Sequence, residues 1–465
     1  MFDSATYSRR REILQGKVGS GIILLLGNEE TSINFPHNFY PFRQDSSFLY
    51  FTGLDRPGLA LLIDADSGNV TLYGDDPGLD HVVWMGPQPS LGELSDRTGI
   101  EEVANSDKLV DDLAEAGSQG RDIHFLPPYR DKTRLKLSQW LGYEPDEVEA
   151  HASETLIRAI VDQRSQKSEE EIAELEEAVR ITGAMHLAVM RAARTGMLEA
   201  ELAGIVEGIG RSLGSGLSYP PIITINGQIL HNQYYGNRLE EGQLLLGDFG
   251  AENPRHYAGD ITRTFPVSAS FTPQQAEVYQ IVLDALEAGK EALKPGLPYR
   301  DVHLLACTRI AQGLTDMGLM KGSPEEAVRA GAHALFFPHG LGHMMGLDVH
   351  DMEDLGEDYV GYGEDFDRSD QFGLKSLRLA RKLEENFVLT VEPGIYFIPP
   401  LIEKWKADGK HTDFINYEKL QPFLTFGGIR IEDDVVVTKE GYRLLGESVP
   451  RTVSEIEEIR ASALS

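Results

Sequence analysis

The stretch PHGLGHMMGLDVHD, residues 338–351, places three histidines among glycines and apolar residues. His339 and His343 are four positions apart, as two ligands on one helical turn would be, but Gly340 and Gly342 disfavour a helix here. The stretch also lacks the glutamate of the zinc-protease helix H-E-x-x-H. We therefore predict a non-helical segment whose histidines, suited by their pKa to proton transfer near neutral pH, belong to a site completed by other segments.

Four further segments each place one carboxylate among glycine and strand-forming residues. The segments are LLLGDFG (244–250), YAGDITRTFPV (257–267), LTVEPGIY (389–396) and GGIRIEDDVVV (427–437), and their carboxylates are Asp248, Asp260, Glu392 and Glu432. Oxygen ligands with a single histidine, His343, suit manganese, and cobalt or zinc can also occupy such a site. Because four carboxylates carry too much negative charge for one divalent ion, we predict two ions about 3.5–4 Å apart.

A turn between two strands would bring two of these carboxylates together. Asp248 and Asp260 flank Asn253-Pro254, a turn signal, so that two antiparallel strands would place their side chains close to each other. On the second strand Asp260 and Thr262 share a face, because side chains alternate along a strand. An isolated Asp248 would instead be interpreted as a turn-stabilising aspartate.

The last segment turns a pair of charged residues toward one face of a strand. Ile429 and Ile431 point to one side, and Arg430 and Glu432 point to the other. Such a face meets either solvent, which is the more common case, or a charged site. Glu392 stands at the exit of an apolar strand, where a carboxylate is costly unless it is paired or bound to a metal.

At these five segments the sequence resembles the pita-bread metallopeptidases, the family of prolidase, aminopeptidase P and methionine aminopeptidase. The resemblance implies that the ligands of a dinuclear centre are Asp248, Asp260, His343, Glu392 and Glu432, with no ligand position substituted. It extends upstream, because YPFRQDSSFLYFTGL (40–54) resembles the amino-terminal domain of prolidase and aminopeptidase P, which methionine aminopeptidase lacks. The implied fold is α+β, with a pita-bread catalytic domain of two pseudo-symmetric halves and an amino-terminal α/β domain.

The resemblance also implies roles for three further histidines. His339 and His350 would hydrogen-bond the substrate and the tetrahedral intermediate. His231, in INGQILHNQ (225–233), would lie near the scissile bond. The chain has 13 histidines, and any one of them taken alone can be an ordinary core or surface residue.

Four other side chains complete the predicted site. By resemblance, Glu392 would also carry a proton to the leaving nitrogen, and Arg430 would orient the ligand carboxylates and offset their charge. Arg378 and Tyr396 would contact the substrate. An arginine at position 378 is equally compatible with a surface residue whose stem is packed.

The predicted reaction is hydrolysis of the amino-terminal Xaa-Pro peptide bond, as in aminopeptidase P. Two metal ions generate hydroxide from water near neutral pH, so no serine or cysteine nucleophile is required. The alternative is a prolidase, an Xaa-Pro dipeptidase, because LKSLRLARKLEENFVLTVEPGIYF (374–397) and SVPRTVSEIEE (448–458) resemble that enzyme more closely. Arg378 would then hold the free carboxylate of a dipeptide. A third possibility is a relative without metals that binds proteins.

Composition excludes several classes of partner. The chain of 465 residues has a net charge of −31 and a pI near 4.8, which argues against nucleic acid and anionic membranes. Cys307 is the only cysteine, in an expected helix interior, so the chain suits a reducing compartment. Without a signal-peptide pattern or an apolar run of about 18 residues, we predict a cytoplasmic protein. The predicted partners are proline-containing peptides and further copies of the chain, in a dimer or a tetramer.

A change in composition marks the predicted domain boundary. Residues 1–162 alternate strands and helices, whereas 163–465 open with the polar stretch DQRSQKSEEE (162–171), in which Ser168 and Glu171 form a capping-box pattern. The expected helices lie near 107–117, 168–194, 198–213, 273–293 and 299–317, and the expected strands near 18–27, 57–64, 69–73, 243–249, 257–267, 386–392 and 427–438. The segments 351–385 and 398–426 are expected to be loops or short elements over the site.

Overall fold

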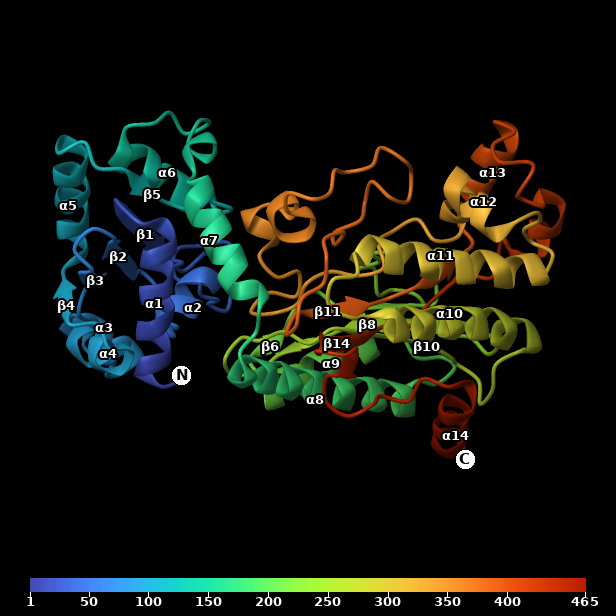
Figure 1. Ribbon diagram of the computed structural model, residues 1–465. Helices are drawn as coiled ribbons and strands as arrows, with labels where there is room; N and C mark the ends of the chain where they lie inside the picture. Colours follow the sequence, from blue (N-terminus) through green and yellow to red (C-terminus); the bar gives the residue numbers. More distant parts are fainter. The chain divides into compact units, whose positions relative to one another are not determined.

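The computed structural model describes all 465 residues and groups them into two compact units (Figure 1). The first unit comprises Met1–Arg164 and Asp354–Tyr359, and the second comprises Ser165–Glu353 and Val360–Ser465. The change between them falls in α7 (Glu154–Ser165), the helix that also contains the expected boundary between 162 and 163. The segment Asp354–Tyr359 was expected in the second domain, and it groups with the first unit instead.

A mixed five-stranded sheet forms the centre of the first unit. The strands are β1 (Ile22–Leu26), β2 (Ala60–Asp64), β3 (Val70–Tyr73), β4 (Glu102–Ala104) and β5 (Ile123–His124), in the order β4-β3-β2-β1-β5. The pairs β1–β2 and β2–β3 are antiparallel, and β1–β5 and β3–β4 are parallel. The predicted strands at 18–27, 57–64 and 69–73 correspond to β1, β2 and β3. The first begins later than expected, because α1 continues to Val18.

Helices cover both faces of this sheet, which explains why β1 is apolar along its length. The helices are α1 (Ser4–Val18), α2 (Ser46–Thr52), α3 (Leu79–Met85), α4 (Leu91–Thr98), α5 (Ser106–Ser118) and α6 (Asp131–Leu141), followed by the short η1 (Glu149–His151). Leu24 and Leu62 pack with Leu109 and Leu113 of α5 on one face. Helices α1 and α2 lie against the opposite face.

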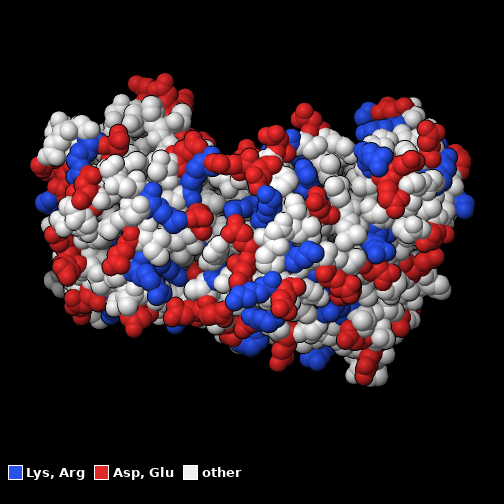
Figure 2. Space-filling model, in the orientation of Figure 1, with Lys and Arg blue, Asp and Glu red and all other residues white.

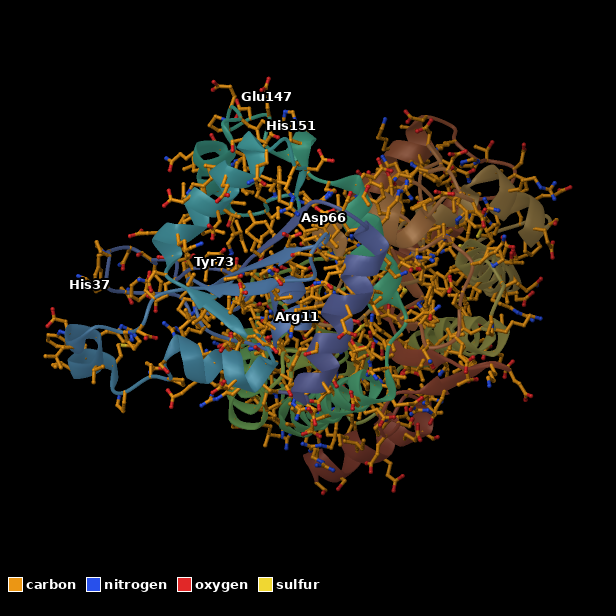
Figure 3. All side chains as sticks on the ribbon, turned by 60° about the vertical axis from the view of Figure 1, so that its left-hand side comes forward. Arg11, His37, Asp66, Tyr73, Glu147 and His151 are labelled. Carbon is orange, nitrogen blue, oxygen red and sulfur yellow. The ribbon has the colours of Figure 1, made fainter.

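Arg11 joins three helices of the first unit. It lies on α1 (Figure 3), is 3% exposed, and donates hydrogen bonds to the carbonyl oxygens of Phe51 and Thr98, both at 2.9 Å. Burial lowers the pKa of the Arg11 guanidinium to about 10, which still leaves it charged at neutral pH. One buried cation therefore satisfies carbonyl groups at the ends of α2 and α4 that their own helices leave unpaired.

Four small antiparallel sheets form the second unit. The larger ones are β10-β8-β7, with β7 (Ile222–Thr224), β8 (Leu244–Phe249) and β10 (Ile261–Pro266), and β11-β14-β15, with β11 (Val388–Val391), β14 (Asp433–Val437) and β15 (Tyr442–Leu444). The smaller ones are β12 (Gly394–Tyr396) with β13 (Gly428–Arg430) and β6 (Gly216–Leu217) with β9 (Ala251–Glu252). Along β10, Thr262 and Thr264 alternate with Ile261, Arg263 and Phe265, so the threonines share one face of the strand.

Helices pack in pairs beside these sheets. The pair α8 (Glu169–Ala192) and α9 (Glu199–Leu213) precedes the first three-stranded sheet, and the pair α10 (Pro273–Ala292) and α11 (Tyr299–Asp316) precedes the second (Figure 1). The repeated order of helix pair and three-stranded sheet agrees with the expected two halves. The other elements are α12 (Pro324–Ala330), η2 (Ala332–Leu335), η3 (Glu353–Leu355), η4 (Asp358–Tyr362), α13 (Pro399–Ala407), η5 (Tyr417–Phe423) and α14 (Val453–Leu464). None of the helices is both long enough and apolar enough to span a bilayer.

Local sequence signals set the ends of the long helices. Ser168 accepts a hydrogen bond from the Glu171 N–H, and the Glu171 carboxylate accepts one from the Ser168 N–H, so the predicted capping box starts α8. Thr272 and Gln275 start α10 in the same way. The expected segments 351–385 and 398–426 contain only short elements, of which the nine-residue α13 is the longest.

The stretch predicted as one strand over 427–438 is two strands in different sheets. The chain leaves β13 at Ile431 and enters β14 at Asp433. Between them the Glu432 N–H donates to the Thr262 carbonyl at 3.0 Å, and the Ile431 N–H donates to the Pro393 carbonyl at 3.3 Å. Because these two residues bond to other segments, Glu432 lies at the junction where β10, β13 and β14 meet.

Candidate metal centre and active site

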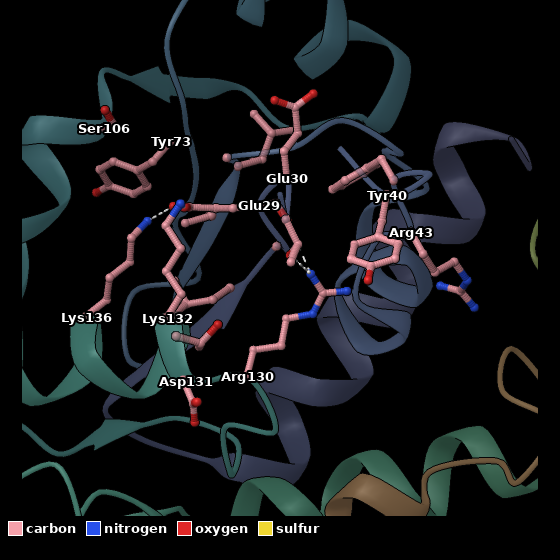
Figure 4. Close-up of a pocket in the computed structure, with 18 of the residues that line it drawn as sticks. Glu29, Glu30, Tyr40, Arg43, Tyr73, Ser106, Arg130, Asp131, Lys132 and Lys136 are labelled. Carbon is pink, nitrogen blue, oxygen red and sulfur yellow. Dashed lines mark hydrogen bonds and ion pairs between the residues drawn. The ribbon is translucent and has the colours of Figure 1, made fainter. Parts of the chain in front are cut away.

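Two cavities differ sharply in the chemistry of their walls. A cavity of 710 Å³ in the first unit (Figure 4) has basic side chains, but Lys132 and Lys136 both form ion pairs with Glu29. A cavity of 390 Å³ in the second unit is lined by Tyr219, His231, Asp248, Asp260, His339, His343, His350, Arg378, Glu392, Arg430 and Glu432, among others. The second cavity gathers all the predicted ligands and is the candidate active site.

The hairpin of β8 and β10 brings Asp248 and Asp260 together, as predicted. Asp248 lies opposite Thr262 in the antiparallel register. Thr262 is two residues after Asp260, so its side chain lies on the same face of the chain. The turn between the strands contains Asn253, whose side chain accepts the N–H groups of Arg255 and Tyr257. The Tyr219 hydroxyl contacts both carboxylates, with 2.6 Å to Asp248 Oδ1. Both aspartates are less than a tenth exposed.

Glu392 and Glu432 approach from the second sheet. Glu392 follows β11 directly, and its N–H donates to the Leu341 carbonyl at 2.8 Å, which joins it to the histidine segment. The Thr262 hydroxyl donates to Glu432 Oε2 at 2.6 Å. The shared face of Asp260 and Thr262 therefore holds Glu432 in place from the first sheet.

His343 completes the set. Its Nδ1 lies 3.1 Å from the Met344 carbonyl oxygen. Since that oxygen can only accept, Nδ1 carries the proton of the neutral ring, and Nε2 keeps a lone pair for a metal ion. That Nε2 lies 3.4 Å from Asp260 Oδ2 and 3.7 Å from Glu392 Oε1. One donor atom each of Asp260, His343 and Glu432 lies within 4.8 Å of the other two. The structure thus places five residues from five segments around one cavity.

Electrostatics shows that the carboxylates lack sufficient positive partners. Burial, with Asp248 nearby, raises the pKa of Asp260 to about 7. Burial also raises the pKa of Glu392 to about 8, and burial with neighbouring carboxylates raises that of Glu432 well above its ordinary value. Arg430 is the one cation that pairs directly with the set, through Asp248. Buried anions without partners are strongly unfavourable, so this donor set fits divalent cations.

Removal of metal should therefore make stability depend on pH. Because Asp260 and Glu392 have folded pKa values of about 7 and about 8, against ordinary values of 3.8 and 4.5, the metal-free folded chain binds more protons than the unfolded chain between these values. Its free energy of unfolding should fall as pH rises from about 4 to about 8. Thermal melts of chelator-treated protein should show a falling Tm over this range, and added Mn²⁺ should raise the Tm more at pH 8 than at pH 5.

The matched control is Asp260→Asn, which removes one of the titrating carboxylates. Its metal-free form should lose less stability between pH 5 and pH 8 than the metal-free natural chain. An equal loss in both proteins would show that the carboxylate cluster is not the source of the pH dependence.

Arg430 lies one layer below the ligands, as predicted. It is 4% exposed, and its guanidinium contacts Asp248, donates to the Tyr396 hydroxyl at 2.8 Å and to Thr262 Oγ1 at 3.2 Å. These three contacts fix the positions of Asp248, of Thr262, which donates to Glu432, and of Tyr396 relative to one another.

The structure places Tyr396 behind the cavity and not in its lining. Tyr396 is 0% exposed, and its hydroxyl lies 2.8 Å from His339 Nε2. His339 Nδ1 is 2.8 Å from the Gly340 carbonyl, so the His339 ring is held at both nitrogens. Burial lowers the pKa of His339 to about 3, so the ring is neutral at pH 7. Tyr396 thus orients His339, and of the two side chains only that of His339 lines the cavity.

The remaining predicted residues also line the cavity. His350 Nδ1 is 2.5 Å from Glu353 Oε2, and Arg378 donates to Glu353 Oε1 at 2.7 Å. The ring of His350 meets that of His343 edge to face, with centroids 4.2 Å apart. His231 also lines this cavity, and burial lowers its pKa. All eleven predicted site residues therefore lie in or directly behind one cavity.

Three residues of the site were not foreseen from the sequence. Tyr219 joins Asp248 to Asp260, and Glu353 joins His350 to Arg378. Asp434 accepts the Asp260 N–H at 3.0 Å, and its second oxygen is buried without a hydrogen-bond partner. Asp434 stands two residues after Glu432, so the alternation of side chains along a strand could have placed it on the same face as Glu432. No local sequence pattern marks Tyr219 or Glu353 as site residues.

Comparison with known proteins agrees with this geometry. Residues 173–439 match the model of metallopeptidase family M24, and residues 7–124 match that of the aminopeptidase P N-terminal domain. Fold and site define a metal-dependent peptidase of the exopeptidase type. The chain belongs to metallopeptidase family M24 and carries an aminopeptidase P N-terminal domain.

Individual relatives come from both branches that the sequence had left open. The chain is 36% identical to the human Xaa-Pro dipeptidase over 94% of its length and 88% of that protein. It is 33% identical to a probable Xaa-Pro aminopeptidase of Uncinocarpus reesii, over 96% of its length and 91% of that protein. Among solved structures, Escherichia coli aminopeptidase P in complex with substrate superimposes with a TM-score of 0.81 at 30% identity, covering 100% of this chain and 99% of that one.

Proposed function

We propose that this protein is an Xaa-Pro aminopeptidase that removes the residue preceding a penultimate proline. The observation that carries the proposal is the convergence of Asp260, His343 and Glu432 within 4.8 Å on a cavity that Asp248 and Glu392 also line. The cavity lining contains no cysteine, since the only thiol, Cys307, is buried elsewhere, and its one serine, Ser376, donates to the Pro338 and Gly373 carbonyls and has no histidine partner. The reaction is therefore a metal-assisted hydrolysis.

Two divalent ions, preferentially Mn²⁺ with Co²⁺ or Zn²⁺ as substitutes, are assigned to Asp248, Asp260, His343, Glu392 and Glu432. When bound, such ions lower the pKa of a water molecule and polarise the peptide carbonyl. The four negative charges of the carboxylates would balance the four positive charges of two divalent ions, so the centre would have no net charge before substrate binds. Arg430 and Tyr219 restrain the oxygens of Asp248 and thereby fix which lone pairs face the cavity.

The surrounding histidines act on the substrate. His339, held by Tyr396 and Gly340, lines the cavity, and so does His350, whose ring packs against that of His343. We assign to them the hydrogen bonds that strengthen as the carbonyl becomes tetrahedral. For this bond His339 must exchange one of its two present partners, Tyr396 or Gly340, for the substrate. His231 is assigned to the region of the scissile bond. Glu392, a carboxylate of the proposed ligand set that also lines the cavity, is assigned the transfer of a proton to the leaving nitrogen.

The length of the substrate separates the aminopeptidase from the dipeptidase. Arg378 lines the cavity and is bound to Glu353, so its charge is already balanced without a substrate carboxylate. A strict dipeptidase gains from an arginine that a free carboxylate can engage. The Arg378–Glu353 pair therefore favours longer peptides, and the dipeptidase remains the second candidate because Arg378 does lie in the cavity.

Hydrolysis of Ala-Pro beside Ala-Pro-Ala, with added Mn²⁺, tests the assignment. We expect the tripeptide to be cleaved at least as fast as the dipeptide. In a dipeptidase, Arg378→Ala would slow cleavage of the dipeptide by about 10-fold to 100-fold, the effect of one hydrogen bond to a charged group, with a smaller effect on the tripeptide. For the aminopeptidase we expect no such selective loss, because Glu353 already balances Arg378. Steady-state kcat/KM for both peptides provides the measurement.

Arg381→Ala is the matched control, because Arg381 lies on the same segment and pairs with Glu384 outside the cavity. It should leave both rates unchanged. A natural enzyme confined to dipeptides, with a selective loss of dipeptide cleavage in Arg378→Ala, would reject the aminopeptidase and establish the dipeptidase.

The wider setting of the enzyme follows from its surface and sequence. On the face shown in Figure 2, Lys and Arg side chains are interspersed among more numerous Asp and Glu. We propose a cytoplasmic enzyme that acts on proline-containing peptides, without nucleic-acid or membrane partners, and that assembles as a homodimer or homotetramer. The division into an amino-terminal domain over 1–162 and a catalytic domain over 163–465 is part of the same proposal.

A further inference from the structure

A second cluster of metal-binding residue types lies away from the carboxylates. His303 and Cys307 are four residues apart on α11, so their side chains share one face of that helix. His333 reaches the same place from η2. All three are 0% exposed, and one donor atom of each lies within 4.8 Å of the other two. Cys307 Sγ and His303 Nε2 are 3.3 Å apart.

The polar atoms of this cluster are largely without partners. His303 Nδ1 has no hydrogen-bond partner, and the ring nitrogens of His333 have none of good geometry, although the Val328 backbone lies close. A neutral imidazole always has one N–H to donate and one lone pair, and buried groups of this kind are normally satisfied. Burial lowers the pKa of His303 to about 3 and of His333 to about 4, so both rings are neutral and have a lone pair to offer.

We propose that His303, Cys307 and His333 bind one Zn²⁺ ion, in a site separate from the catalytic centre. Two imidazoles and one thiolate form a softer donor set than the carboxylates around Asp260, and this set selects zinc over manganese, magnesium or calcium. Tetrahedral zinc, with bonds of about 2.3 Å to sulfur and about 2.0 Å to nitrogen, separates these donors by about 3.6 Å. The observed 3.3 Å between Sγ and Nε2 is near that value.

Three protein ligands leave the fourth tetrahedral position for a water molecule. Binding replaces the S–H bond of Cys307 with a zinc–sulfur bond, and the thiol proton is released to solvent. Without the ion this proton is firmly held, because burial raises the pKa of the Cys307 thiol well above its ordinary value.

The ion would join α11 to the segment that leads into the active site. His333 is followed by Phe336, Phe337 and then His339. The Phe337 ring lies between the two sites, with its centroid 5.5 Å from that of His303 and 4.7 Å from that of His339. A zinc ion at the second site therefore fixes the start of the histidine segment, and its role is structural.

Cobalt substitution tests the site directly, because Cys307 is the only thiol in the chain. The full-length protein would be produced in medium with Co²⁺ in place of Zn²⁺, and its electronic absorption spectrum recorded. We expect a near-ultraviolet thiolate-to-cobalt charge-transfer band, which carboxylate and histidine ligands do not give. The band should be absent from Cys307→Ala and retained in Asp260→Ala, which alters only the catalytic centre.

Zinc analysis gives a second, independent readout. The double variant Asp260→Ala with Glu432→Ala, purified after growth with zinc, should retain about one zinc per chain, and addition of His333→Gln should remove it. His186→Gln is the matched control, since His186 is also a buried histidine but lies against Phe249. Cobalt-loaded natural protein without the thiolate band, or a double variant without zinc, would overturn the second site while leaving the peptidase assignment intact.

Discussion

Glu432→Ala should abolish peptide hydrolysis while the protein remains folded. Glu432 lies at the junction of β10, β13 and β14, and its carboxylate is held by the Thr262 hydroxyl and faces Asp260 and His343. Loss of this oxygen pair removes one of the five residues that would hold the proposed ions, and metal assistance contributes several kcal/mol to such reactions. We expect kcat/KM to fall by about 1,000-fold or more, the equivalent of about 4 kcal/mol.

Metal content should fall with activity. Inductively coupled plasma analysis should give close to two ions per natural chain at the catalytic centre and fewer than one in Glu432→Ala, with Asp260→Ala behaving alike. The fold should survive, because burial already makes the Glu432 carboxylate costly to ionise without metal. Glu252→Gln is the control, as Glu252 pairs with His256 outside the cavity. Near-natural turnover in either ligand variant would reject the dinuclear centre.

His339→Ala should lower kcat strongly and leave the metal content unchanged. The His339 ring is fixed by Tyr396 and the Gly340 carbonyl and faces the cavity, but no ligand role is assigned to it. Removal of one group that stabilises a tetrahedral intermediate costs about 100-fold to 1,000-fold in kcat. KM should change much less, because the interaction is made mainly in the transition state.

His343→Ala provides the contrast within the same segment. Its Nε2 faces Asp260 and Glu392, so this variant should lose metal as well as activity. Measurement of kcat, KM and metal content on both variants separates the two roles. Equal metal loss in both proteins would show that the division of roles between the two histidines is wrong.

Much of the fold could be predicted because its signals are local. The Ser168–Glu171 capping box fixes the start of α8, and Asn253 fixes the turn that joins β8 to β10. Both signals act over three or four residues, within reach of a side chain and its own backbone. The prediction of one strand over 427–438 was wrong, because the break at Glu432 depends on hydrogen bonds that Glu432 and Ile431 donate to the carbonyls of Thr262 and Pro393, which lie far away in the sequence.

The sequence by itself determined the family resemblance, and with it the predicted ligand set Asp248, Asp260, His343, Glu392 and Glu432, since the motif that carries each residue is confined to one short segment. Only the tertiary structure decided what surrounds it. Tyr219 and Glu353 join the site from segments without a motif, and Tyr396 moves from the substrate surface to a position behind His339. Hydrogen-bond partners and burial depend on how distant segments pack together, and no local pattern of residues carries that information.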